Sequence, residues 1–113
     1  MKLDTLLNYS SGDLNFVKET IDLFIEESDS SLTNIARACS SGDWKTVNRL
    51  SHSLKSNYAT FELENLRALA YEIEKASENY TGSGKEIKNK IVQLTNKTKP
   101  VYPMLRQELK RLM

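Results

Sequence analysis

Residues 14–39 read LNFVKETIDLFIEESDSSLTNIARAC, and this stretch decides the fold class. Apolar or small side chains recur there at steps of three and four: Leu14, Val17, Ile21, Phe24, Ser28, Leu32, Ile35 and Cys39. This spacing places them on one face of an α-helix. Asp13, directly before the first of them, suits an N-cap because its carboxylate can accept from the free amides of the first turn. The stretch therefore predicts a long amphipathic helix with one buried face.

The rest of the chain repeats this pattern between short loop signals at 10–13 (SSGD), 40–43 (SSGD) and 81–84 (TGSG). Residues 3–9 indicate a short helix, and Asp43 can cap the helix that follows the second loop. The apolar residues of 44–61 and of 63–80 each recur at helical spacing, and the two segments fit either one bent helix or two helices joined near Thr60. A last stripe spans 87–112 and contains Pro100 and Pro103, which remove amide donors, so we expect a kink or a short break near Lys99.

Several amphipathic helices with short connections form an antiparallel bundle. We predict one all-α domain over residues 1–113, an antiparallel four-helix bundle with a short extra N-terminal helix and a Pro-kinked last helix. A chain of 113 residues is long enough for one buried core.

Composition excludes several classes of protein. The 16 basic and 15 acidic residues give a net charge of +1, which argues against a broad basic surface for nucleic acid. A single cysteine, Cys39, excludes an internal disulfide framework and a multi-cysteine zinc site, and its place on the apolar stripe predicts burial. Since no apolar stretch reaches the roughly 20 residues of a membrane span and no targeting segment is recognisable, we expect a cytoplasmic protein without membrane insertion.

The chain has one histidine, His52. On a helical wheel centred on Val47, it lies about 140° from the core stripe, on the solvent side. That side also carries Lys45, Asn48, Ser56 and Ala59. It is flanked by two cations, Arg49 and Lys55.

A neutral imidazole in that position is a competent nucleophile, and a ring of cations would attract a phosphoryl group. A surface histidine between lysines also occurs by chance. A metal site fits less well, because no carboxylate lies three or four residues from His52 on its own helix.

Residues 51–56 (SHSLKS), followed by Leu66, Leu69 and 72–74 (EIE), resemble the histidine-containing phosphotransfer (HPt) domain, whose signature is alanine-histidine-x-leucine-lysine-glycine. The residues FIEE at 24–27 and GDW at 42–44 resemble family features on the first bundle helix and in the loop before the histidine helix. The similarity covers about residues 10–80.

The resemblance implies a phosphorelay carrier. His52 would accept a phosphoryl group from the phospho-aspartate of a response-regulator receiver domain and pass it to another receiver. Lys55 would neutralise the phosphate oxygens, and Ser56 would be the small polar neighbour. Around them, four residues would contact the partner: Lys45, Asn48, Arg49 and Ala59.

The resemblance also implies what the chain lacks and what its partners supply. The sequence itself has no Gly-rich ATP loop and no catalytic aspartate set, so we expect no ATP site and no autokinase activity. We also expect no cofactor or metal in this chain, the divalent metal belonging to the receiver. We expect a monomer that works with receiver domains and a hybrid sensor histidine kinase, and binds no nucleic acid.

Three departures from the family pattern leave alternatives open. Ser51 replaces the usual alanine, Ser56 replaces glycine, and no glycine lies near Glu62, which puts the bend between the two middle helices in doubt. The change at Ser56 supports a second hypothesis, a helical scaffold that binds receiver or kinase domains but carries no phosphate. Phe16 and Leu23 fit either packing beneath the helix at 3–9 or an apolar receiver-binding patch, and Tyr71 is similarly ambiguous.

Overall fold

Capping side chains and loop glycines set the helix boundaries in the computed structural model, which describes residues 3–113. The helices, in chain order, are α1 (Asp4–Tyr9), α2 (Leu14–Ser40), α3 (Trp44–Thr60), α4 (Glu64–Ser77), α5 (Lys85–Thr98) and α6 (Val101–Leu112). The all-α prediction is confirmed.

Both predicted N-caps are present. The Asp13 carboxylate accepts from the amides of Asn15 (3.0 Å) and Phe16 (3.2 Å), and the Asp43 carboxylate accepts from the amide of Thr46 (3.2 Å). Each cap satisfies amides that have no partner within the helix, so α2 and α3 begin where the sequence predicts.

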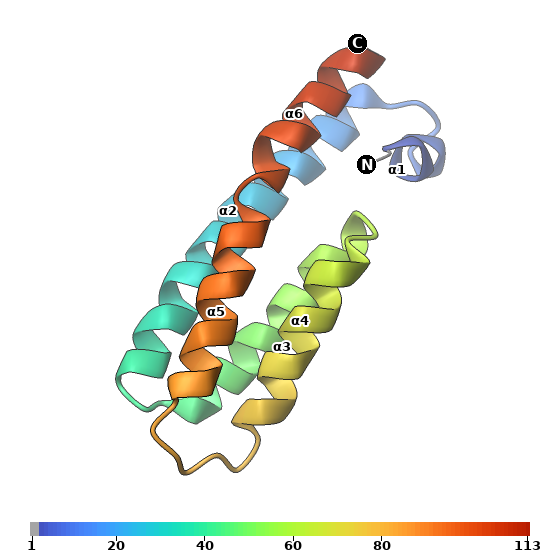
Figure 1. Ribbon diagram of the computed structural model, residues 1–113. Coiled ribbons are helices and arrows are strands. Elements are labelled where there is room, and N and C mark those ends of the chain that lie inside the picture. The colour runs from blue at the N-terminus through green and yellow to red at the C-terminus, as the bar shows by residue number, and fades with distance from the viewer. Residues whose placement is uncertain (1–2) are drawn as a thin grey trace.

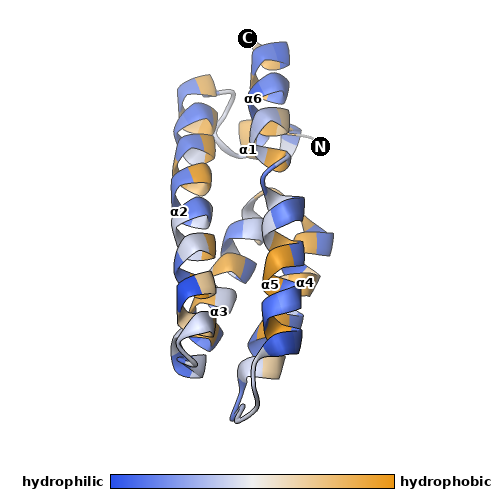
Figure 2. Cartoon of the chain, turned by 60° about the vertical axis from the view of Figure 1, so that its left-hand side comes forward, coloured by the Kyte–Doolittle hydropathy of each residue, from blue (hydrophilic) through white to orange (hydrophobic). Residues whose placement is uncertain are grey.

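The core is enclosed by α2, α3, α4 and α5 together with α6, which extends α5 (Figure 1). α3 packs against α2 and α4, and α5 packs against α4 and α2, which closes an antiparallel ring. α6 continues from α5 along α2, and α1 packs on α2. α2, α5 and α6 show hydrophobic and hydrophilic residues in alternation along their length, as one buried and one solvent-facing side require (Figure 2). The bundle prediction is therefore confirmed, with the extra N-terminal helix.

Pro100 lies at the break in the last helix and Pro103 lies inside α6, and the chain does not turn away from the core there. α5 ends at Thr98, and Lys99 and Pro100 keep right-handed helical dihedral angles, so α6 continues in nearly the same direction. Val101 and Leu105 of α6 are buried in the same cluster as the α5 side chains. The predicted break near Lys99 is confirmed.

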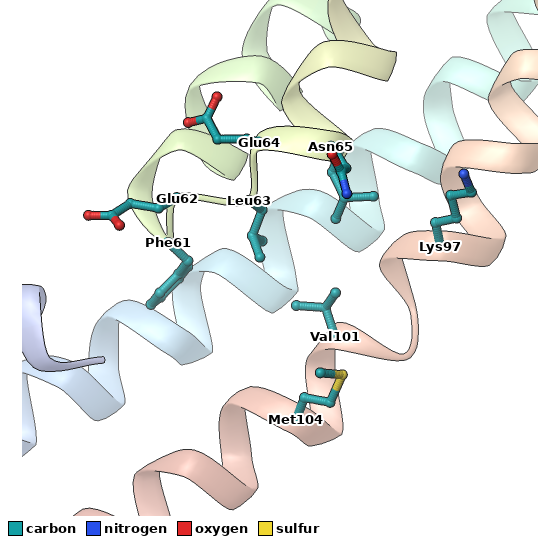
Figure 3. Close-up of a pocket in the computed structure, with 9 residues that line it drawn as sticks. Phe61, Glu62, Leu63, Glu64, Asn65, Lys97, Val101 and Met104 are labelled. Carbon is teal, nitrogen blue, oxygen red and sulfur yellow. The ribbon is translucent and has the colours of Figure 1, made fainter. Parts of the chain in front are cut away.

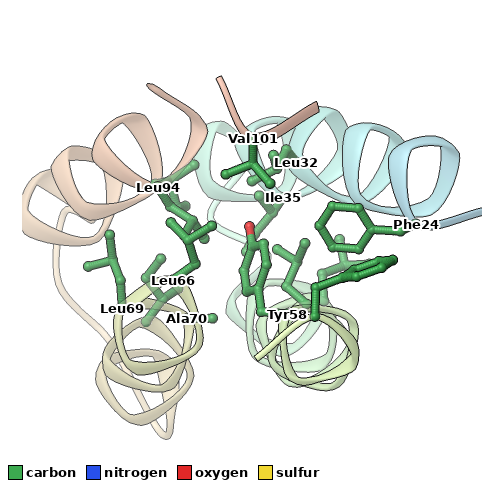
Figure 4. Packing of buried hydrophobic residues seen from close by; sticks show 14 of the residues in the cluster. Phe24, Leu32, Ile35, Tyr58, Leu66, Leu69, Ala70, Leu94 and Val101 are labelled. Atoms are coloured by element: carbon green, nitrogen blue, oxygen red, sulfur yellow. The ribbon is translucent and has the colours of Figure 1, made fainter. Parts of the chain in front are cut away.

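Aromatic rings organise the centre of the bundle (Figure 4). Tyr58 is fully buried, and its hydroxyl forms a hydrogen bond of 2.8 Å with the Thr98 hydroxyl. The Phe24 ring meets the rings of Tyr58 and Phe61 edge-on, with centroids 6.2 and 5.1 Å away. Cys39 is buried as predicted. Within residues 3–113, no helix is both long and apolar enough to cross a membrane.

The middle of the chain forms two helices, α3 and α4, joined by a turn at 61–63. Glu62 makes this turn in the left-handed conformation, with φ of +56°. The bend therefore forms without glycine, but a residue with a Cβ atom is strained there.

Replacing Glu62 by glycine is expected to stabilise the protein by roughly 0.5–1 kcal/mol, because the relief of left-handed strain exceeds the added entropy of the unfolded chain. The matched control, Glu72→Gly, lies inside α4 and should destabilise by a similar amount. Urea unfolding of both variants measures the difference. A Glu62→Gly variant less stable than the parent would contradict the strain argument.

Candidate functional site

His52 lies near the middle of α3 and points away from the core. Its side chain is 64% exposed, whereas Leu50 and Leu54 beside it are buried. Ser51 is also buried and its hydroxyl donates to the Val47 carbonyl, so serine fits the small packed position. The helical-wheel prediction for His52 is confirmed.

A carboxylate from the neighbouring helix holds the imidazole. Glu74 of α4 places Oε2 2.6 Å from Nδ1 of His52, while its Oε1 accepts from Nζ of Lys55 at 2.8 Å. The Lys55 hydrogen bond, helped by that from His52, holds the pKa of the Glu74 carboxyl below its ordinary value. An ionised carboxylate only accepts hydrogen bonds, so Nδ1 donates to Glu74, and in the neutral form of the ring the Nε2 lone pair is free.

Asn48 fixes the register of α4 against α3. Its side-chain amide donates to the Glu74 backbone carbonyl (2.8 Å) and to the Ser77 hydroxyl (3.3 Å). Asn48 lies four residues before His52, so this link is one helical turn from the imidazole. It places the Glu74 side chain beside the ring.

Tyr71 of α4 completes this side of the site. The Lys55 ammonium lies 5.0 Å from the centroid of the Tyr71 ring, and the Lys75 ammonium lies 5.7 Å from it. Tyr71 is 44% exposed, so it is not a core residue. The sequence left this residue ambiguous, and the structure shows it beneath two cations.

A hollow of about 590 Å³ lies beside His52, between α2 and α3. α2 contributes the carboxylates of Glu26 and Glu27, and α3 contributes Arg49, Ser56 and His52 itself. The hollow therefore combines two anionic side chains with one cation. It lies on the α2 side of α3, and Glu74 approaches from the α4 side.

The structure adds a carboxylate to the cations that the sequence predicts around His52. Within residues 3–113, Lys55 is the only one of the three cations bonded to the His52–Glu74 pair, whereas Arg49 lines the hollow. Lys45 lies in another hollow, with Trp44 and Tyr80. The group in contact with the imidazole is a carboxylate, which a wheel of one helix cannot show.

Ser56, the predicted small polar neighbour of His52, and the predicted partner-contact residues Asn48 and Ala59 lie in different surroundings. Ser56 is exposed and lines the hollow with His52. Ala59 is exposed near the end of α3, and the Asn48 side chain is occupied within the protein. Their roles in partner binding stay predictions.

Phe16 and Leu23 differ in exposure. Leu23 is 54% exposed on α2, whereas Phe16 is half-buried with its ring 6.5 Å from that of Tyr9. Phe16, Leu23 and Glu27 are seven and four residues apart, so they share one face of α2. That face leads to the hollow beside His52.

A larger hollow, of about 760 Å³, lies away from this site. It is formed where the α3–α4 turn meets the junction of α5 and α6, and Val101 and Met104 lie across from Leu63 (Figure 3). Phe61, on its wall, is nine residues after His52, which is about 13 Å along a helix. None of the interactions that organise His52 reaches it.

The sequence did not place Glu74 or Tyr71 beside His52: Glu74 entered only through the family resemblance, and Tyr71 was left ambiguous between packing and a receiver-binding patch. Glu74 directly follows the buried Ile73, a position at the edge of the core stripe where a side chain can reach the adjacent helix. That position was the available signal, but it does not identify which residue of α3 lies opposite. Within residues 3–113, no three His, Cys, Asp or Glu side chains are grouped as around a metal ion.

Comparison with known proteins adds one finding. The family model described as Hpt domain matches residues 19–112, which include α3, α4 and the whole His52 site. Neither the curated proteins nor the solved structures gave a match.

Proposed function

Because the chain belongs to the Hpt domain family, whose members carry phosphoryl groups on histidine in phosphorelay signalling, we propose that His52 is its phosphoacceptor. One observation carries this proposal: the imidazole is exposed, and Glu74 holds it by Nδ1 so that Nε2 is free. A nucleophile oriented by a hydrogen-bonded carboxylate is a recurrent arrangement for transfer reactions.

The proposed step transfers the phosphoryl group from the phospho-aspartate of a receiver domain. The Nε2 lone pair attacks phosphorus, a P–N bond forms, and the P–O bond to the aspartyl carboxylate breaks. The carboxylate leaves with the bonding electron pair. The ring keeps its proton on Nδ1 and becomes a phosphoimidazolium, whose positive charge Glu74 stabilises. Transfer to the aspartate of another receiver is the reverse reaction.

Lys55 and Ser56 would assist this step. The Lys55 ammonium is hydrogen-bonded to Glu74, the same carboxylate that binds the imidazole. A small movement of the ammonium would therefore bring it to the phosphoryl oxygens. Ser56 follows His52 by one helical turn and is exposed, so its hydroxyl can donate to the same oxygens or to the partner. The divalent metal is assigned to the receiver domain.

We place the receiver over the hollow between α2 and α3. A standard protein interface covers about 800 Å² on each partner, so a receiver that reaches His52 must also cover neighbouring helices. The exposed Leu23 and the half-buried Phe16 offer apolar area on the α2 face that leads to the hollow. Glu26 and Glu27 would favour a receiver with basic side chains at this point. A hybrid sensor histidine kinase is the proposed source of such receivers, and the chain is proposed to act as a monomeric carrier without autokinase activity.

The test mixes the protein with a phosphorylated receiver domain and follows the label. We expect label on this chain that is labile in acid and stable in alkali, as a phosphohistidine is, and ¹⁵N NMR should place phosphorus on Nε2. Binding of phosphorylated receivers without any label, across several divalent metals, would overturn the proposal and favour the phosphate-free scaffold. Label on Nδ1 would contradict the role given to Glu74.

A further inference from the structure

We propose that Tyr71 is a positioning residue for phosphotransfer, because the face of its ring holds the Lys55 ammonium beside His52. This inference rests on the proposed function of His52 and adds a residue on α4 to the site. It assigns a role to an exposed aromatic side chain that the core does not use.

The contacts of Lys55 carry the argument. Its ammonium is 2.8 Å from Glu74 Oε1 and 5.0 Å from the Tyr71 ring centroid. Tyr71 and Glu74 are three residues apart on α4, so they form adjacent parts of one surface. The Lys55 side chain is only 22% exposed, whereas that of Lys75, the other lysine above the ring, is 54% exposed. Lys55 is therefore confined between two groups of the neighbouring helix.

The two groups restrain the ammonium in different ways. A carboxylate accepts a directional hydrogen bond, which must be weakened or shared when Lys55 turns to a phosphoryl oxygen. An aromatic face attracts a cation without a directional lone pair, so the ammonium can tilt and remain over the ring. Tyr71 would thus keep Lys55 near Nε2 during the transfer, when Glu74 is needed by the phosphoimidazolium.

The ring, and not the hydroxyl, is the part of Tyr71 that this role requires. Within residues 3–113, the contacts of Tyr71 with Lys55 and Lys75 are made by the face of its ring. Phenylalanine should therefore replace tyrosine with little loss, whereas leucine keeps a similar apolar volume and removes the aromatic face.

The first experiment measures single-turnover transfer rates from a phosphorylated receiver. Tyr71→Leu is expected to lower the rate roughly two- to fivefold, the range for loss of one partly exposed cation–π contact. Tyr71→Phe should restore it, and the control Lys75→Ala should leave it unchanged. In a Lys55→Ala background, Tyr71→Leu should cause no further loss, because the residue acts through Lys55.

A second experiment separates positioning from contact with the receiver. With phosphoramidate as a small phosphoryl donor, Tyr71→Leu should still slow labelling of His52. An effect seen only with the receiver, or an equal loss in the Lys55→Ala background, would overturn the proposal. So would a Tyr71→Phe variant as slow as Tyr71→Leu.

A third measurement does not depend on phosphate. The Lys55 ε-methylene protons should show an upfield ring-current shift in the NMR spectrum that is kept in Tyr71→Phe and lost in Tyr71→Leu. Absence of this shift in the parent protein would overturn the positioning role. A parent protein that shows the shift but takes no label on His52 would instead overturn the proposed function.

Discussion

Replacing His52 by glutamine is expected to abolish transfer of acid-labile phosphate to this protein, with a loss on the order of a thousandfold or more. Glutamine has a similar reach and can hydrogen-bond to Glu74, but its amide nitrogen has no free lone pair to attack phosphorus. The measurement is single-turnover transfer from a labelled receiver, followed by acid and alkali treatment of the product.

The His52→Gln variant should remain folded, because the replaced side chain is largely exposed. Its unfolding midpoint and its affinity for the receiver therefore serve as controls that separate lost chemistry from lost structure. Label transfer to His52→Gln at the parent rate would show that another residue accepts the phosphoryl group.

Replacing Glu74 by alanine is expected to slow transfer by about tenfold to a hundredfold, by analogy with the loss of a carboxylate that orients a metal-binding histidine. The imidazole would lose the group that places its proton on Nδ1, and the developing phosphoimidazolium would lose its counter-charge. Glu74→Gln should be intermediate, since the amide oxygen can accept from Nδ1 but carries no charge. The matched control is Glu72→Ala on the same helix, where the carboxylate is exposed and pairs with Lys90. Rates equal in Glu74→Ala and Glu72→Ala would remove Glu74 from the mechanism.

The same carboxyl group predicts a pH dependence of stability. Because the folded protein lowers the pKa of Glu74 below its ordinary 4.5, its ionised form stabilises the fold above that pH. This contribution is lost as pH falls through the lowered pKa. The difference in unfolding free energy between the parent and Glu74→Gln should therefore shrink in acid, which denaturant titrations at several pH values can measure.

The fold was predictable because its signals are local. The spacing of Val17, Ile21 and Phe24 predicted the buried face of α2, and Asp13 and Asp43 marked helix starts that the structure confirms. The turn between α3 and α4 could not be decided from the sequence, because Glu62 has no strong turn preference. It adopts the left-handed conformation because the packing of the two helices requires the reversal there.

The candidate site was predictable only in part. His52 was correctly placed outside the core, since its angle from Val47 depends only on the period of one helix. The carboxylate in contact with the ring could not be predicted, because the cations were placed from the period of α3 alone while Glu74 comes from α4. The family signature around His52 also indicated the Hpt domain, and the family match confirms it.

The sequence by itself therefore determined the helical stripes, the caps of α2 and α3, the family and the exposure of the one histidine. The stripes, the caps and the exposure depend on residues within a few turns of one another, and the family depends on motifs spread along the chain. Only the tertiary structure decided which nitrogen of His52 is free and which aromatic ring lies under Lys55. Those contacts depend on the register of α4 against α3. The Asn48 hydrogen bonds and the packed core set this register together. It is not encoded in the sequence pattern of either helix, because a helical period carries no information about the register between two helices.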